Sequence, residues 1–113
     1  MRITPNAQAI DVSLKGADLR GSRLVKANLT KADLRMAQLA GLPLGSGRVT
    51  PSNLIGARLR YVQGQGADLT DAVLDDADLG GADFTGAILD RTSLDGADTT
   101  ATLGLGVRRQ AVA

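Results

Sequence analysis

Carboxylates are nearly the only side chains in this sequence that could do acid–base or metal chemistry. Its 113 residues include twelve acidic residues, all of them Asp, and neither His nor Cys. The usual general bases, thiolates and soft metal ligands are therefore missing. The neighbouring carboxylates of Asp75 and Asp76 could hold a hard cation, although two solvated side chains explain the same pair. We expect no catalytic residue, no metal site and no cofactor, and we predict that the protein is not an enzyme.

Other short motifs add no chemistry. The segment GSGRVT at residues 45–50 lacks both the spacing and the Lys of a phosphate-binding loop. Residues 1–15 contain no apolar run of signal-peptide length, and no stretch is long and apolar enough to span a membrane. The expected location is the cytoplasm, or a virion assembled there, and no membrane partner is expected.

A repeat with a period of five residues determines which structural elements hold the carboxylates. Sixteen of the 17 positions taken every fifth residue from Leu14 to Leu94 are large and apolar, and 14 of them are Leu. Ten of the 17 positions two residues earlier are Ala. On a helix, five residues turn the chain through about 500°, so the Leu side chains would point in every direction. The period fits neither a helix nor a simple strand.

Units such as GADLR, KANLT, KADLR, GADLT and GADFT resemble the A-(D/N)-L-x-x signature of the pentapeptide-repeat family. That resemblance implies an all-β fold, a right-handed quadrilateral β-helix of about 4–5 coils with one unit on each side. The central Leu and the preceding Ala point inward in that fold. The structural core expected from the resemblance is Leu14, Leu19, Leu24, Leu29, Leu34, Leu39, Leu54, Leu59, Leu69, Leu74, Leu79, Phe84, Leu89 and Leu94.

The polar residues of the repeat have a structural explanation. An Asp or Asn directly before the Leu can bond nearby turn backbone, and Gly at the last position of the unit tolerates a positive φ. We interpret these carboxylates and amides as turn residues first. They are Asp18, Asn28, Asp33, Asn53, Asp68, Asp78, Asp83 and Asp98.

The repeat is expected to extend over residues 12–101, with residues 1–11 as an N-terminal cap and 102–113 as a C-terminal tail. Residues 40–66 keep the phase but lose the consensus and are rich in Gly and Pro. They form either degenerate but intact coils or a loop of whole-repeat length. We favour intact coils, because Leu44, Val49, Leu54 and Leu59 hold the inward phase. Gly64, which has no side chain, predicts a void or bulge near Gln63–Gly66.

Charge is unevenly distributed along the chain. Residues 1–63 have a net charge of +7 and residues 64–101 a net charge of −8, so a solenoid would have a basic end and an acidic end. If residues 20 apart stack, Lys15, Arg35, Ile55, Asp75 and Asp95 form one outward column, and Arg20, Ala40, Arg60, Gly80 and Thr100 form another. The requirement for solubility alone explains why outward positions are polar. The functional interpretation is that the uneven charge steers a partner, or another copy of the chain, into place. The candidate interaction surface is Lys15, Arg20, Arg35, Arg58, Arg60, Asp71, Asp75, Asp76, Asp90, Asp95, Arg108 and Arg109.

Three functions fit these features, in decreasing order. The first is a structural or protein-interaction module, a rigid spacer that docks on a larger assembly, such as a virion or capsid, or stacks end to end with its own copies. The second, implied by the quinolone-resistance members of the family, is a DNA mimic that binds a topoisomerase such as gyrase. The third is nucleic-acid binding through the basic half. In that half Tyr61 is the one aromatic residue on which a base could stack.

Overall fold

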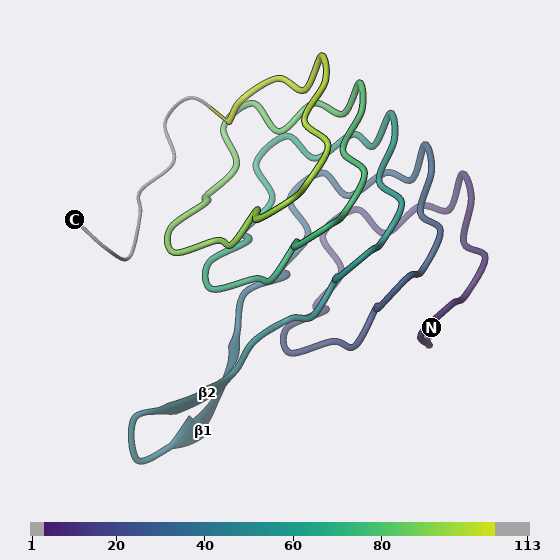
Figure 1. Ribbon diagram of the computed structural model, residues 1–113. Coiled ribbons are helices and arrows are strands. Elements are labelled where there is room, and N and C mark those ends of the chain that lie inside the picture. The colour runs from purple at the N-terminus through teal and green to yellow at the C-terminus, as the bar shows by residue number, and fades with distance from the viewer. Residues whose placement is uncertain (1–3, 106–113) are drawn as a thin grey trace.

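The backbone winds into a right-handed stack of square coils, seen in Figure 1 as nested loops running from purple to yellow. This computed structural model describes residues 4–105, and no helix occurs among them. Isolated parallel bridges connect successive coils. The bridges divide the described chain into coils at residues 4–21, 22–41, 52–71, 72–91 and 92–105.

Each coil has four sides of about five residues, which we name A to D. Side A is centred on Leu29, Leu59 and Leu79, and side B on Leu34, Gly64 and Phe84. Side C is centred on Leu39, Leu69 and Leu89, and side D on Leu24, Leu54 and Leu74.

A tight turn ends each side and makes the corner. The N–H of Ala77 donates to the carbonyl of Leu74 at 3.0 Å, and Asp76 between them has a φ of 60°. This is the geometry of a type II turn, which needs a positive φ at its third residue. Gly satisfies that requirement at Gly16 and Gly81, with φ of 70° and 69°. The expected role of Gly at the last position of the unit is confirmed.

Backbone hydrogen bonds join each coil to the next. The N–H of Leu59 donates to the carbonyl of Asp78 at 2.7 Å, and the N–H of Asp78 donates to that of Ala57 at 2.9 Å. The same exchange recurs on the other sides. A single side is too short to be stable alone, so stability comes from stacking.

The core is a narrow column of Leu and Ala inside the stack. Twelve of the 14 inward residues expected from the sequence are buried, and Leu19 and Leu94 are partly buried and pack against them. Both belong to the first or last described coil, where fewer neighbours cover the interior. Small Ala side chains at the buried positions two residues before the Leu allow the corners to close, as at Ala27, Ala57 and Ala77.

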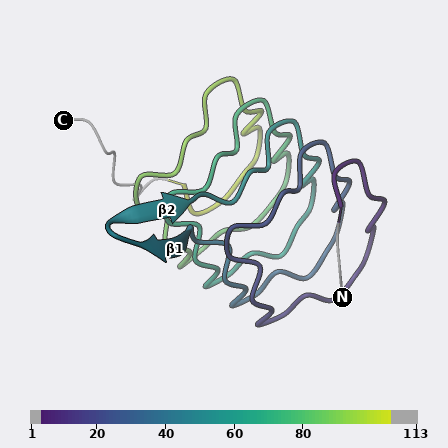
Figure 2. The same cartoon turned by 90° about the horizontal axis from the view of Figure 1, so that it is seen from below.

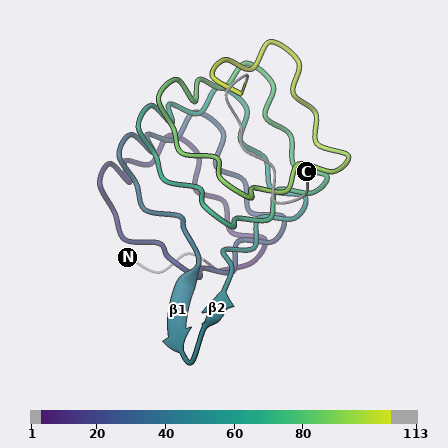
Figure 3. The same cartoon turned by 90° about the vertical axis from the view of Figure 1, so that its left-hand side faces the viewer.

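A β-hairpin interrupts the stack between the second and third coils. Strand β1 (Leu42–Gly45) pairs antiparallel with β2 (Arg48–Thr50), and the two project from the corner between sides C and D (Figures 1–3). Our preference for intact coils was therefore wrong here. The bridge spacing is 20 residues elsewhere but 30 residues across the hairpin, for example Arg23 to Asn53. Ten residues, 42–51, are thus inserted without changing the inward phase.

The root of the hairpin is closed by a buried hydroxyl. Ser52 is fully buried. Its Oγ accepts a hydrogen bond from the N–H of Gly21 at 3.0 Å, and its hydroxyl donates to the carbonyl of Ala40 at 3.2 Å. The chain therefore leaves the stack after Gly41 and returns to it at Ser52, directly beside the point of departure.

Gly64 leaves no void. A Cβ placed on Gly64 would collide with the ring of Phe84, which stacks on it from the next coil of side B. Phe84 is 1% exposed. The void or bulge predicted near Gln63–Gly66 is therefore wrong, because the one aromatic ring of the core fills the space that a missing Leu would have occupied.

The N-terminal segment extends the stack rather than covering it. Gln8 bridges to Asn28, the N–H of Ala9 donates to the carbonyl of Asn28 at 2.8 Å, and Asn6 has the corner φ of 63°. Residues 4–11 thus adopt the repeat conformation although their sequence departs from the consensus.

Candidate interaction surface

The carboxylates and amides before each central Leu are bound to their own turns. In all eight positions a side-chain oxygen accepts a hydrogen bond from the backbone N–H two residues later, at 2.9 to 3.2 Å. Several also accept from a Thr hydroxyl, as Asp68 does from Thr70 at 2.6 Å. The expected turn role is confirmed.

Among the residues that the structure describes, four ion pairs reduce the number of available charges. They join Arg20 to Asp18, Arg35 to Asp33, Arg60 to Asp78 and Arg91 to Asp71.

The Asp33 pair shows how these contacts work. The guanidinium of Arg35 donates to Asp33 at 2.7 and 2.9 Å, and the backbone N–H of Arg35 adds a third bond. Together they lower the pKa of Asp33 to about 2. Exposed pairs of this kind contribute little to stability, but they occupy side chains that would otherwise meet a partner.

Charge varies from coil to coil rather than simply from end to end. The first described coil is neutral by formal charge, the second carries +3, the third is neutral, the fourth carries −4 and the fifth −2. The positive charge is concentrated in the second coil, and the projecting hairpin adds Arg48. The negative charge lies in the C-terminal coils.

The ten-residue insertion also changes which charges stack. The column of Lys15 and Arg35 continues to Gln65 and Thr85, and the column of Asp75 and Asp95 contains Val25 and Ile55 in the preceding coils. The two columns predicted from a uniform spacing of 20 residues are wrong across the insertion. Neither a basic nor an acidic column runs the whole length of the molecule.

The hairpin carries the largest group of exposed apolar side chains. Leu42 is 37% exposed, Leu44 51% and Val49 45%. Leu42 lies close to Gly21 through its Cβ and a terminal methyl, and a methyl of Val49 lies close to Gly41. A two-stranded hairpin is at best marginally stable alone, and both of its strands have an open edge.

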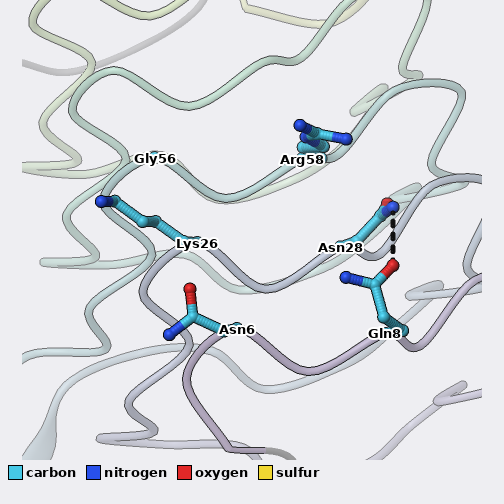
Figure 4. Close-up of a pocket in the computed structure, with 6 residues that line it drawn as sticks. All are labelled: Asn6, Gln8, Lys26, Asn28, Gly56 and Arg58. Atoms are coloured by element: carbon cyan, nitrogen blue, oxygen red, sulfur yellow. Dashed lines mark hydrogen bonds between the residues drawn. The ribbon is translucent and has the colours of Figure 1, made fainter.

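A polar depression of about 380 Å³ crosses side A and the corner before it. Figure 4 shows Asn6 and Gln8 from the first coil, Lys26 and Asn28 from the second, and Gly56 and Arg58 from the third. The amide of Asn28 donates to Gln8 at 3.2 Å, and its oxygen accepts from the N–H and hydroxyl of Thr30. Asn28 is thereby held in one orientation. No carboxylate lines the depression.

Three carboxylates form an acidic corner between sides D and A of the last coils. Asp75 and Asp95 stack one above the other, with Asp76 adjacent, and the hydroxyl of Ser93 donates to Asp75. Within residues 4–105 none of the three forms an ion pair.

The structure distributes the candidate interaction residues over several sides. Arg58 lies in the depression and Lys15 on side B. Arg20, Arg35, Arg60 and Asp71 are taken up by ion pairs. Asp90 is on side C next to Arg91, and Arg108 and Arg109 lie outside the described residues. The sequence interpretation missed the hairpin residues, which a hairpin pattern of two short strands around Gly45–Gly47 could have revealed.

No three carboxylates of the described part of the chain, those of the acidic corner included, are arranged so that they could hold a metal ion. None of its segments forms a helix that could cross a membrane.

Comparison with known proteins agrees with the geometry. The family model "Pentapeptide repeats" matches residues 10–41, 52–91 and 65–98, with eight copies, and its matches leave out the inserted residues. No curated protein sequence matches the chain.

Among solved structures, a pentapeptide repeat protein from the Arabidopsis thaliana thylakoid lumen is 24% identical, with a TM-score of 0.61 over 88% of this chain and 63% of that one. HetL from the cyanobacterium Nostoc, described as involved in heterocyst differentiation regulation, is 34% identical over 85% of this chain and 38% of its own, with a TM-score of 0.49. QnrB1, a plasmid-mediated fluoroquinolone resistance protein, is 13% identical, with a TM-score of 0.36 over 88% and 56%. The chain spans less than two thirds of the length of each. These similarities concern the fold alone.

Proposed function

Because the chain belongs to the pentapeptide-repeat family, whose stacked backbone is a scaffold for outward side chains, we propose that it is a non-enzymatic protein-interaction module. It is a rigid, charge-polarised solenoid that docks on a larger assembly. A virion or capsid surface is one assembly of this kind, and a stack of its own copies is another. The cytoplasm, or a virion assembled there, is the location that goes with this proposal.

The projecting hairpin is the observation that carries the proposal. The stack does not need it, since Gly41 and Ser52 are already adjacent, yet it exposes Leu42, Leu44 and Val49. Val49 pairs with Pro43 and therefore lies on the face opposite to Leu42, so the hairpin exposes apolar side chains on both faces. Exposed apolar side chains gathered on one element mark protein interaction sites. Burying one such side chain fully is worth about 1.5–3 kcal/mol, so a few can anchor a partner. The charge difference between the second and fourth coils would orient that partner.

Affinity purification from the native source tests this proposal. Wild-type protein should retain a stoichiometric protein partner, or form oligomers whose mass in light scattering depends on salt concentration. Leu44→Ser should reduce retention at least about tenfold, as expected for the loss of about 1.4 kcal/mol.

Ile10→Ser is the matched control, because Ile10 is also about half exposed but lies in the first coil. It should leave retention unchanged. A salt-independent monomer that retains no partner, or equal losses with both variants, would contradict the proposal.

A second candidate function is binding to a topoisomerase as a DNA mimic. It is favoured by the acidic corner of Asp75, Asp76 and Asp95, in which Asp75 and Asp95 are separated by one coil rise of roughly 4.8 Å. Purified protein at micromolar concentration should then inhibit supercoiling by gyrase, and Asp76→Asn should weaken the inhibition. Supercoiling that is unaffected at that concentration would end this alternative.

A further inference from the structure

Two cations in the depression on side A have no anionic partner within the described chain. Lys26 lies over Gly56, with its side-chain Cγ 3.3 Å from where a Cβ of that glycine would be. Arg58 is exposed and lies in the next coil, where it pairs with Asn28. Neither takes part in an ion pair with any of residues 4–105.

The nearest carboxylate in the column is already engaged. Asp78 stacks directly on Arg58, but both of its oxygens accept from Nη1 of Arg60 at 3.2 Å, and one also accepts from the N–H of Gly80. Arg60 is held in turn over the ring of Tyr61, with 5.4 Å between the guanidinium carbon and the ring centroid. Asp78 is therefore neutralised from the opposite side, and Arg58 keeps its donors for another acceptor.

The other side chains of the depression also offer donors. Gln8 uses its oxygen to accept from Asn28, which leaves its NH2 group free to donate, and Figure 4 shows this group directed toward Asn6. The oxygen of Asn28 is occupied by Thr30. A depression that has two cations, several amide donors and no carboxylate is suited to an oxyanion.

We propose that this depression binds a carboxylate-bearing segment of a partner protein, with Arg58 and Lys26 as the charged contacts. The inference rests on the proposed interaction function and names the chemistry of one docking site. Arg58 can bind a carboxylate with two parallel hydrogen bonds, while Lys26 acts as a point charge. A short acidic segment fits better than a longer nucleic-acid strand, because Asp98 continues the same column beyond Asp78, forms no ion pair within residues 4–105 and would repel an extended polyanion.

Nuclear magnetic resonance titration with hexaglutamate tests the proposal. The peptide should shift the side-chain amide signals of Asn6, Gln8 and Asn28 and the backbone amide of Gly56. Arg58→Gln should weaken this binding about tenfold. Lys15→Gln, which removes the same charge on side B, should leave it within about twofold of wild type. Both side chains are exposed, so neither variant should impair folding.

A twelve-residue oligothymidylate is the competing probe. It should bind more weakly than hexaglutamate at the same ionic strength. The proposal is overturned by the absence of hexaglutamate-induced shifts, by equal weakening in Lys15→Gln and Arg58→Gln, or by tighter binding of the oligothymidylate.

Failure here is separable from failure of the proposed function. A natural partner that is lost from Leu44→Ser but retained by Arg58→Gln would leave the interaction module standing and remove only the carboxylate site. Hexaglutamate binding by a protein that retains no partner would support the carboxylate site and contradict the interaction module.

Discussion

At the scale of single residues, Gly64 and Phe84 behave as one unit. The inward positions of side B run Leu14, Leu34, Gly64, Phe84, so the residue with no side chain lies next to the one with the largest. Interiors are packed closely enough that a change of one methylene is felt. The ring of Phe84 occupies the volume above Gly64, and neither residue can be exchanged independently of the other.

Placing Leu at both positions should recover part of the stability that Gly64→Leu alone loses. Gly64→Leu should destabilise the fold by about 1–3 kcal/mol through collision with Phe84. Phe84→Leu should cost about 1–2 kcal/mol through the cavity it leaves. The double variant Gly64→Leu/Phe84→Leu should be more stable than Gly64→Leu alone, as measured by urea unfolding. Strictly additive losses would show that the two residues are not coupled.

At the scale of elements, the hairpin and the stack are structurally independent. Gly41 still donates its N–H to the carbonyl of Thr70 at 3.1 Å, and Ser52 already occupies a buried position of the next coil. Gly41 occupies the corner position of its unit. Its φ is not positive here, where the hairpin begins, but a Gly can adopt the positive φ of a corner without strain. Joining Gly41 directly to Ser52 would therefore produce a regular corner.

Deletion of residues 42–51 should give a folded protein. We expect its free energy of unfolding to stay within about 1 kcal/mol of wild type, because the lost contacts are few and the closed loop is shorter. Deletion of residues 42–50 is the control, since it leaves Pro51 at the corner with no N–H and a fixed φ. The nine-residue deletion should be clearly less stable by thermal unfolding. Equal stability of the two, or loss of folding in the first, would contradict this account.

How far the sequence predicts the structure differs between elements for a physical reason. The period of five, the inward Leu residues and the turn role of residues such as Asp33 follow from local geometry, which every unit repeats. The hairpin escapes the same reasoning because its ten residues are two whole periods, so Leu44 and Val49 fall in the inward phase while pointing to solvent. Burial of Phe84 against Gly64 depends on stacking between coils, and a period along the chain does not report which coils are neighbours.

At the scale of the whole molecule, carboxylates with lowered pKa are spread along the stack. Hydrogen bonds from Arg20, Arg35, Thr85 and Thr100, in each case led by the side chain, lower the pKa of Asp18, Asp33, Asp83 and Asp98. A lowered pKa in the folded state stabilises the fold above the pKa of the unfolded chain. This stabilisation is lost as the pH falls through the folded value.

Acid should therefore weaken the entire stack. Between pH 4 and pH 2 the melting temperature of wild type should fall, by a modest amount because the carboxylates are exposed, with Asp33 losing its contribution toward its pKa of about 2. Asp33→Asn keeps an acceptor for the turn but removes the charge, so it should be less stable than wild type at pH 7 and approach wild type near pH 2. Circular dichroism melts at several pH values measure both. A constant difference between the two proteins across this range would refute the assignment.

The closed root of the hairpin has a consequence for how this protein can change over evolutionary time. Because the chain departs and returns at one point, with Ser52 bonded to Gly21 and Ala40, the coils do not depend on the length or sequence of the hairpin tip. Under the proposed function, the contacts made by Leu44 and the folding of the coils then depend on different residues. Substitutions at the hairpin tip would change the partner with little loss of stability.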